Sequence, residues 1–144
     1  MNNAVPSGSI RIVIDGPPVA KGRPRMSKNG HVHTPEKTRT YESHGRVAAQ
    51  LAMDGLEPLH GAVGVSVEVL LPIPESWPKS RKQAALCGHI WPTTKPDADN
   101  YAKCALDLAN KIVWDDDSQV VSLYVNKRYD ADPRMIIEVV SIYG

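Results

Sequence analysis

The chain has 144 residues, the size of one domain built around one hydrophobic core. Apolar residues make up 42% and charged residues 23% of it, a composition that excludes an intrinsically disordered protein. The longest apolar stretches are shorter than the ~20 residues of a membrane helix, and the first residues do not resemble a signal peptide. Cys87 and Cys104 form no CxxC and are expected to be small buried residues in a reducing compartment. We therefore expect one globular domain over residues 1–144, located in the cytoplasm and not in a membrane.

The net charge of +1 conceals two regions of opposite sign. Residues 21–46 hold seven basic and two acidic side chains, whereas residues 97–117 hold six acidic and two basic ones. This separation favours a polyanionic partner at the basic region and a cation at the acidic one. Two solvated surfaces without any ligand would explain the same distribution.

The first half of the chain is predicted to form a strand, a basic turn-rich segment and a long helix. Isoleucines at alternate positions indicate the strand, and the Asn29-Gly30 pair is typical of a hairpin turn. The helix is expected to begin with Thr34 as N-cap followed by a proline, and to carry Val47 and Leu51 on its apolar side. Residues 1–8 are expected to be frayed. The predicted ranges are Ser9–Asp15 for the strand, Val19–Thr34 for the turn-rich segment and Pro35 to about Met53 for the helix.

The second half is predicted to contain a strand, two helices and two further strands that pair as a hairpin around Tyr129–Pro133. Alternating valines indicate the first strand, and apolar residues at helical spacing indicate the second helix. The predicted ranges are strand Val63–Leu71, helix from about Pro78 to Leu86, helix from about Asp99 to Val113, strand Gln119–Arg128 and strand Met135–Ile142. The order strand, helix, strand, helix, helix, strand, strand predicts a single α+β domain with a mixed sheet and packed helices.

Acidic residues flank the last predicted helix on both sides. Asp97 and Asp99 stand two apart in a segment that begins extended, so both carboxylates could share one hard cation. The positive end of the helix would favour anionic groups at the same place, and Lys103 lies one turn further along the same side. A cation and an ammonium group on two sides of a phosphate suit phosphoryl transfer.

Each part of this pattern also has a structural explanation. Asp97 and Asp99 could serve as an N-cap and a helix-dipole acid, and Lys103 could be a solvated helix residue. The acidic run Asp115–Asp117 could be a charged turn that protects the edge of the next strand. The two acidic groups would meet only if the following strand runs back beside Asp97 and Asp99.

The segment from Lys95 to Tyr129, KPDADNYAKCALDLANKIVWDDDSQVVSLYVNKRY, resembles the signature of the RusA family of Holliday junction resolvases of phages, prophages and some bacteria. The opening GPPVAKGRPR and the helix containing Tyr41–Gln50 also fit this family, so the resemblance covers most of the chain and implies a RusA-like fold. It implies that four residues are essential for catalysis: two acids, a lysine and a third acid. These residues are Asp97, Asp99, Lys103 and Asp117, with Asp116 as the alternative for the third acid.

The resemblance further implies a Mg²⁺-dependent homodimer that nicks opposing strands of a four-way DNA junction in recombination and repair, in the cytoplasm of a bacterial host. In this interpretation Asp97, Asp99 and Asp117 hold the metal that activates water, and Lys103 stabilises the phosphate charge or the leaving group. Ligands that are all oxygen favour Mg²⁺ or Mn²⁺ over Zn²⁺. A DNA-binding module that does not cleave is the alternative. Another DxD enzyme on a phosphorylated substrate is disfavoured because the short chain shows no nucleotide-binding βαβ unit.

Residues outside the acidic motif also invite functional interpretations. Lys21, Arg23 and Arg25 alternate in a Gly/Pro loop, and we expect them to contact DNA phosphates. Trp77 and Trp91 flank the short helix and are expected to pack on it. Trp91 could instead stack on an unpaired base near the site.

Overall fold

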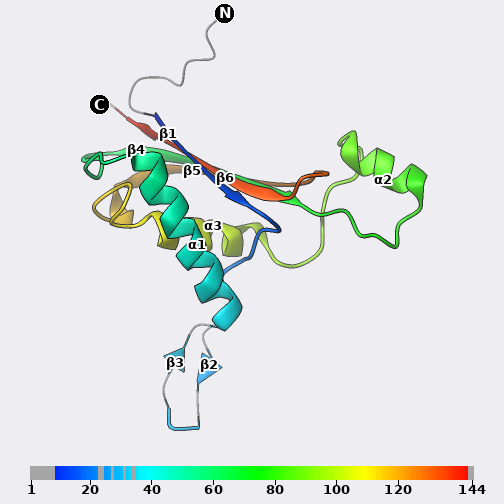
Figure 1. Ribbon diagram of the computed structural model, residues 1–144, viewed down its shortest axis with the longest axis horizontal. Helices are drawn as coiled ribbons and strands as arrows, with labels where there is room; N and C mark the ends of the chain where they lie inside the picture. Colours follow the sequence, from blue (N-terminus) through cyan, green and yellow to red (C-terminus); the bar gives the residue numbers. More distant parts are fainter. Residues whose placement is uncertain (1–8, 23–24, 27, 31, 34, 143–144) are drawn as a thin grey trace, which may run out of the picture.

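A computed structural model of the chain describes residues 9–22, 25–26, 28–30, 32–33 and 35–142 (Figure 1). It confirms the α+β class and the mixed sheet with packed helices. The expectation for residues 1–8 concerns a segment outside the described ranges. The elements are β1 Ser9–Asp15, β2 Arg25–Met26, β3 Val32–His33, α1 Glu36–Met53, β4 Val63–Leu71, α2 Lys79–Leu86, α3 Ala98–Ala109, the 3-10 helix η1 Asp117–Gln119, β5 Val120–Tyr129 and β6 Arg134–Ser141.

The main sheet has the strand order β1-β6-β4-β5, in which only β4 and β5 run parallel to each other. The expected hairpin between the last two strands is therefore wrong, because β6 lies between β1 and β4 and never pairs with β5. The turn signal correctly marks a reversal of the chain, but it does not say which strands become neighbours. Alternate β6 residues are fully buried, as the central position requires, whereas most β5 residues are exposed or half-buried at the edge.

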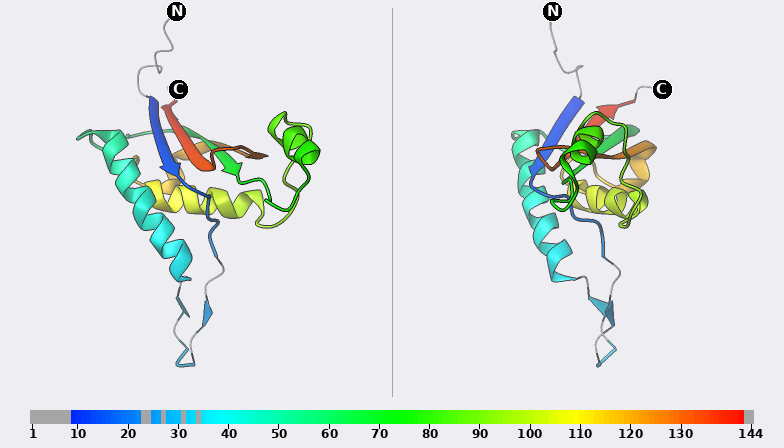
Figure 2. Two further views of the ribbon diagram at one scale, coloured as in Figure 1. Left: turned by 45° about the vertical axis from the view of Figure 1, so that its right-hand side comes forward. Right: turned by 90° about the vertical axis from the view of Figure 1, so that its right-hand side faces the viewer.

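Helices α1 and α3 cover one face of the sheet, and the hydrophobic core lies between them and the strands (Figures 1 and 2). The predicted apolar side of α1 is wrong: Val47 and Leu51 are 55% and 74% exposed. The buried side carries Tyr41, Gly45 and Ala49 instead. A Cβ at Gly45 would lie only 2.6 Å from the Leu108 side chain, so α1 and α3 approach too closely there for larger residues.

The helix boundaries differ from the expected ones by a few residues. Helix α1 begins at Glu36 with Pro35 as N-cap, while Thr34 lies outside the described residues. It ends after Met53, where Asp54 has the left-handed conformation with a φ of 47°. Helix α3 begins at Ala98, one residue before the expected start. Among the described residues, no helix is long and apolar enough to span a bilayer.

The crossover from β4 through α3 to β5 decides where the acidic motif lies. Parallel neighbours require such a crossover, and the helix then runs opposite to the two strands it joins. The start of α3 therefore lies at the C-terminal end of β5, and its end lies at the N-terminal end of β5. The Lys127 Nζ of β5 confirms this direction, because it donates to the carbonyl oxygens of Thr94 and Pro96, both at 3.0 Å.

The sequence did not reveal that β4 and β5 are parallel. Strand β4 alternates valines on its helix-covered face, and every one of them is buried. The short antiparallel pair β2–β3 lies beyond the N-terminal end of α1, away from the main sheet (Figure 2). Asn29 and Gly30 stand in the turn between these strands, which confirms the predicted hairpin turn.

Candidate active site

The N-terminal end of α3 presents two exposed carboxylates. Asp97 is the N-cap residue in an extended conformation, with φ −72° and ψ 154°, and Asp99 lies in the first turn. The Asp97 side chain makes no capping hydrogen bond, although an N-cap aspartate usually accepts one from the backbone. The backbone of Asp97 therefore occupies the capping position while its carboxylate remains available to a ligand.

Lys103 lies on the exposed surface of α3, one turn beyond Asp99. Among the described residues, no ion pair joins Lys103, Asp97 or Asp99 to another side chain. Within the part of the chain that the structure describes, both a positive and two negative side chains at one helix end are therefore without an ion-pair partner. An arrangement of this kind can attract a cation and a phosphate to the same place.

The three aspartates beyond the far end of α3 have three different environments. The Asp115 carboxylate pairs with His60 Nδ1 at 2.5 Å on the surface. The Asp116 carboxylate accepts from the backbone N–H of Ser118 at 2.9 Å and so caps η1. Hydrogen bonding from the Ser118 side chain, and after it from the Ser118 backbone N–H, holds the pKa of Asp116 below its usual value. The carboxylates of Asp115 and Asp116 thus each have a structural partner.

Asp117 is the aspartate whose carboxylate is held by the core. Its Oδ1 accepts a hydrogen bond of 2.8 Å from Nε1 of Trp114, a fully buried side chain. Such a partner fixes the orientation of a carboxylate and leaves its second oxygen to a ligand, as outer-shell partners do at metal sites. The geometry therefore favours Asp117 over Asp116 as the third functional acid.

Gln119, two residues beyond Asp117, secures this end of the fold. Its Nε2 donates to the carbonyl oxygens of Leu59 and Gly61, both at 2.9 Å, and its Oε1 accepts from the backbone of Asp116 at 2.8 Å. The glutamine in the motif thus ties the acidic turn to the loop before β4. Its role is structural, and it fixes the backbone that carries Asp117.

One chain does not bring the two acidic groups together. The twelve residues of α3 span about 18 Å, and the acids lie at its opposite ends. The strand does run back along the helix, but Asp117 precedes its start, and Lys127 near its end is the residue beside Pro96. Among the described residues, no group of three or more His, Cys, Asp or Glu side chains is placed to hold a metal ion. The oxygen donors suit Mg²⁺ in kind, but each end of α3 supplies only part of a ligand set.

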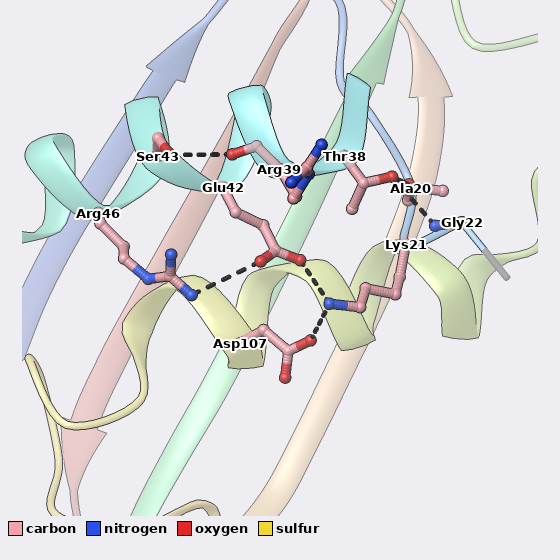
Figure 3. A network of polar contacts seen from close by, with 9 residues as sticks. All are labelled: Ala20, Lys21, Gly22, Thr38, Arg39, Glu42, Ser43, Arg46 and Asp107. Carbon is pink, nitrogen blue, oxygen red and sulfur yellow. Dashed lines mark hydrogen bonds and ion pairs between the residues drawn. The ribbon is translucent and has the colours of Figure 1, made fainter. Parts of the chain in front are cut away.

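Lys21, predicted to contact DNA, lies in an ion-pair network between α1 and α3 (Figure 3). Its Nζ is 2.8 Å from Glu42 Oε1 on α1 and 2.9 Å from Asp107 Oδ2 on α3. Arg46 adds a second cation to the buried Glu42 carboxylate at 3.6 Å. Burial lowers the pKa of Lys21, but the hydrogen bonds and charges of Glu42 and Asp107 outweigh it and raise the pKa above its usual value.

This placement favours a structural role for Lys21, because its charge is already neutralised by two carboxylates. The Lys21 backbone N–H donates to the carbonyl oxygen of Asn100 at 2.9 Å, next to the acidic pair. Gly22 and Ala20 on either side bond to the Thr38 hydroxyl of α1. Of the other predicted phosphate contacts, Arg23 lies outside the described residues, and for Arg25 only the backbone of β2 is described.

The sequence contains a second basic region, which was not among the predicted DNA contacts. Residues 79–96 hold four basic side chains and no acidic one, and this stretch comprises α2 and the segment leading to Asp97. A local charge count would have found it. The two cysteines also differ: Cys104 is buried, which raises its pKa to about 12, whereas Cys87 is exposed, so its expected burial is wrong.

Comparison with known proteins gives the family. A family model described as Endodeoxyribonuclease RusA matches residues 15–140, which include both acidic groups and Lys103. The chain belongs to the RusA endodeoxyribonuclease family. An uncharacterized protein of Bacillus subtilis (strain 168), YqaN, is 41% identical to it over 132 residues, covering 88% of this chain and 92% of the relative.

Proposed function

We propose that this RusA-family chain is a metal-dependent endodeoxyribonuclease that resolves four-way DNA junctions by paired symmetric nicks. Its expected setting is recombination and repair of phage or bacterial DNA in the cytoplasm of a bacterial host. The observation that carries the proposal is the Asp97 carboxylate, which stands at the N-cap of α3 without a capping bond, close in sequence to Asp99 and Lys103. A purely structural N-cap would use that carboxylate to satisfy the helix N–H groups.

The proposed roles follow from the chemistry of the side chains. Asp97, Asp99 and Asp117 would hold Mg²⁺, or Mn²⁺ in its place, through carboxylate oxygens. When bound, the ion supplies charge stabilisation at the attacked phosphate and activates the hydrolytic water. Lys103 stabilises the negative charge that develops on the phosphate or the leaving oxygen, because its ammonium group has no competing carboxylate among the described residues. The Trp114–Asp117 hydrogen bond keeps one ligand oriented.

A homodimer explains how acids at opposite ends of α3 can serve one site. Strand β5 forms the edge of the main sheet and pairs only with β4 among the described strands. A two-fold axis at this edge would align two copies of β5 in antiparallel directions. The start of one β5, where Asp117 lies, would then face the end of the other, where Lys127 holds the segment before Asp97.

The side chains of β5 agree with such pairing. Val121, Leu123 and Tyr124 are all exposed large residues on this ten-residue edge strand. A long apolar edge strand is a template for another strand, and soluble proteins usually cover one. Pairing two β5 strands would satisfy the unpaired backbone groups and produce two symmetric sites, as two opposed nicks require.

The proposed DNA contacts are Arg23 and Arg25, which stay predictions because the structure does not describe these side chains. The backbone bonds of Ala20, Lys21 and Gly22 hold the base of this basic segment against α1 and the start of α3. Phosphates bound there would lie on the same side as the acidic pair. Lys21 would contribute by holding the segment in place and not by contacting phosphate.

The test is cleavage of a labelled four-way junction beside a linear duplex of matched sequence. With Mg²⁺ or Mn²⁺ we expect symmetric nicks in the junction and an intact duplex, and with a chelator we expect no cleavage. Junction binding without cleavage under every metal condition would contradict the proposal. That result would favour the alternative, a DNA-binding module that does not cut.

A further inference from the structure

The three tryptophans of the chain have very different surroundings. Trp114 is fully buried, and Trp77 packs edge-on against Tyr129 with a ring-centroid separation of 5.3 Å. Trp77 also lies beneath the Arg81 guanidinium, whose carbon is 4.1 Å from the ring centroid. Trp91, by contrast, is 55% exposed. The packing expected for Trp77 is confirmed, while most of the Trp91 ring remains open to solvent.

Trp91 stands in the wall of a cavity between the end of α2 and the end of β5. The cavity has a volume of about 230 Å³. Leu86, Cys87 and Gly88 form the wall on the side of α2, and Arg128 and Asp130 contribute polar groups on the side of β5. This volume is below the ~300–1,000 Å³ of pockets for drug-sized ligands, so a single flat ring system fits it best.

The cavity is next to the candidate active site. Lys127, the neighbour of Arg128, bonds to the carbonyl oxygens of Thr94 and Pro96. Only five residues separate Trp91 from Asp97, so the end of β5 touches both the cavity and the segment that leads into the acidic pair. A group held in the cavity would therefore lie at the end of β5 that also binds the segment before Asp97.

The charge around the cavity fits a nucleic acid. Segment 79–96, which supplies Trp91 and the α2 side of the wall, holds four basic and no acidic residues, and the β5 side of the wall carries one cation, Arg128, and one acid, Asp130. The Arg128 guanidinium is half exposed and its contact with Glu68 is long, at 3.4 Å. An exposed aromatic ring among cations is the combination that binds single-stranded nucleic acids, through stacking on the ring and phosphate contacts beside it.

We propose that this cavity binds one unpaired nucleobase of the DNA substrate, stacked on Trp91, with the half-exposed Arg128 guanidinium beside its polar edge. The inference rests on the proposed function and adds a substrate subsite to it. Bases next to the crossover of a junction lose their stacking more readily than those within a duplex, so the subsite would favour branched over linear DNA. Stacking a base on an aromatic side chain contributes about 10- to 100-fold to affinity.

The experiment places 2-aminopurine at each base flanking the crossover of a four-way junction and measures its fluorescence on binding. The protein carries Asp97→Asn so that the DNA stays intact. With Trp91 or Trp91→Phe we expect the probe to be quenched at one position at least, since both rings can stack on it. With Trp91→Ala we expect no quenching and about 10-fold weaker junction affinity, with duplex affinity unchanged.

Leu56→Ala is the matched control, because Leu56 is 60% exposed and lies beyond the end of α1, away from the cavity. It should leave quenching and affinity unchanged. Alkylation of Cys87 gives a second measurement on the unmutated cavity: bound junction should slow it, and bound duplex should not. Quenching that is the same with Trp91→Ala at every position, or unchanged Cys87 alkylation, would overturn the proposal.

These measurements do not depend on cleavage, so they separate the subsite from the proposed function. If the wild-type chain cuts no DNA but the probe responds to Trp91, the subsite stands and the nuclease proposal fails. If the chain cuts junctions and the probe ignores Trp91, the nuclease proposal stands and the subsite fails.

Discussion

The two ends of α3 carry acids that look equivalent in the sequence and are not equivalent in the structure. At the start, Asp97 and Asp99 are exposed, and the Asp97 carboxylate makes no capping bond. At the far end, Asp115, Asp116 and Asp117 each have a defined partner. Among the described residues, the carboxylates and the lysine at the start have no side-chain partner, whereas the far end has one acid anchored by Trp114 and two acids with structural partners.

This difference shows that a cluster of aspartates is not by itself a metal site. The Asp116 carboxylate caps η1, whereas Asp117 is oriented by the buried Trp114, and its second oxygen has no partner among the described residues. In the proposed function, the start of α3 and Asp117 supply complementary halves of one ligand set. They lie beyond opposite ends of α3, a helix about 18 Å long, so the proposed function requires two chains for one site.

The largest expected effect is at the start of α3. Asp97→Asn and Asp99→Asn keep the side-chain shape but remove the charge that a hard cation requires. Cleavage of the four-way junction should fall by roughly 10³-fold or more. Binding should persist or tighten, since repulsion of the phosphates is reduced. Gel-shift and cleavage assays on the same junction check both statements.

A lysine variant separates charge stabilisation from metal binding at the same end. Lys103→Ala should abolish cutting as well, yet leave metal affinity intact by calorimetry, because an ammonium group is no ligand. Normal cleavage by all three variants would show that the free groups at the start of α3 have no catalytic role.

The second prediction compares two neighbouring acids at the far end. Asp117→Asn should reduce cleavage by roughly 10³-fold or more without a large loss of stability, because Trp114 can still donate to the amide oxygen. Asp116→Asn should keep cleavage within about tenfold of wild type. The lowered pKa of Asp116 means that its carboxylate stabilises the fold above its ordinary pKa and ceases to do so as the pH falls through the lowered value. Cleavage rates of the Asp116→Asn and Asp117→Asn variants at neutral pH decide which aspartate is the third catalytic acid. An inactive Asp116→Asn variant beside an active Asp117→Asn variant would assign that role to Asp116.

The third prediction concerns the ion-pair network of Lys21, Glu42 and Asp107, which joins α1 to α3. Lys21→Met should lower the free energy of unfolding by about 2 kcal/mol, because Glu42 is buried and loses its closest partner. The salt dependence of junction binding should stay unchanged, whereas Arg23→Ala with Arg25→Ala should reduce its slope by about one unit for each lost phosphate contact. Urea titrations and salt-dependent affinities measure the two effects. If Lys21→Met reduced the slope of the salt dependence, Lys21 would itself contact DNA phosphates.

The pH dependence of this network follows from the raised pKa of Lys21. A lysine whose pKa is raised by folding contributes its full stability below the unfolded value of 10.5 and loses it as the pH rises through the folded value. The difference in unfolding free energy between wild type and Lys21→Met should therefore be constant at neutral pH and shrink in the alkaline range above 10.5.

The smallest expected effect is at the surface pair of Asp115 and His60. Both side chains are more than half exposed, so Asp115→Asn should change the free energy of unfolding by less than about 1 kcal/mol. Cleavage should remain within about tenfold of wild type. Thermal unfolding and a cleavage time course measure this, and a loss of cleavage comparable to that of Asp117→Asn would contradict the assigned structural role.

Much of the fold could be predicted from local patterns, because those patterns report burial within a single element. The alternating strands Ser9–Asp15 and Val63–Leu71 and the helix after Asp97 all form where expected. The start of α3 was predictable for the same reason, since its acids and Lys103 lie within seven residues. Residues that are close in the sequence are also close in the structure there.

The rest depends on contacts between distant segments. A turn signal at Tyr129–Pro133 does not tell that β6 will enter the sheet between β1 and β4. The spacing of residues in the sequence does not reveal that Asp117 lies at the beginning of β5, whereas Pro96 lies beside the end of that strand. Nor does a basic loop reveal that Lys21 meets Glu42 and Asp107, its partners on two helices.

The central claim is that one active site combines the start of α3 from one chain with Asp117 from its partner. Mixing Asp97→Asn and Asp117→Asn chains after denaturation and refolding tests it directly, because each homodimer has no intact site. In a mixed dimer one site receives both substitutions and the other receives none. Junction nicking should then return to about a quarter of the wild-type site concentration, with a single nick per mixed dimer. Mixed dimers that form, by mass spectrometry of the refolded sample, and show no nicking would contradict the account.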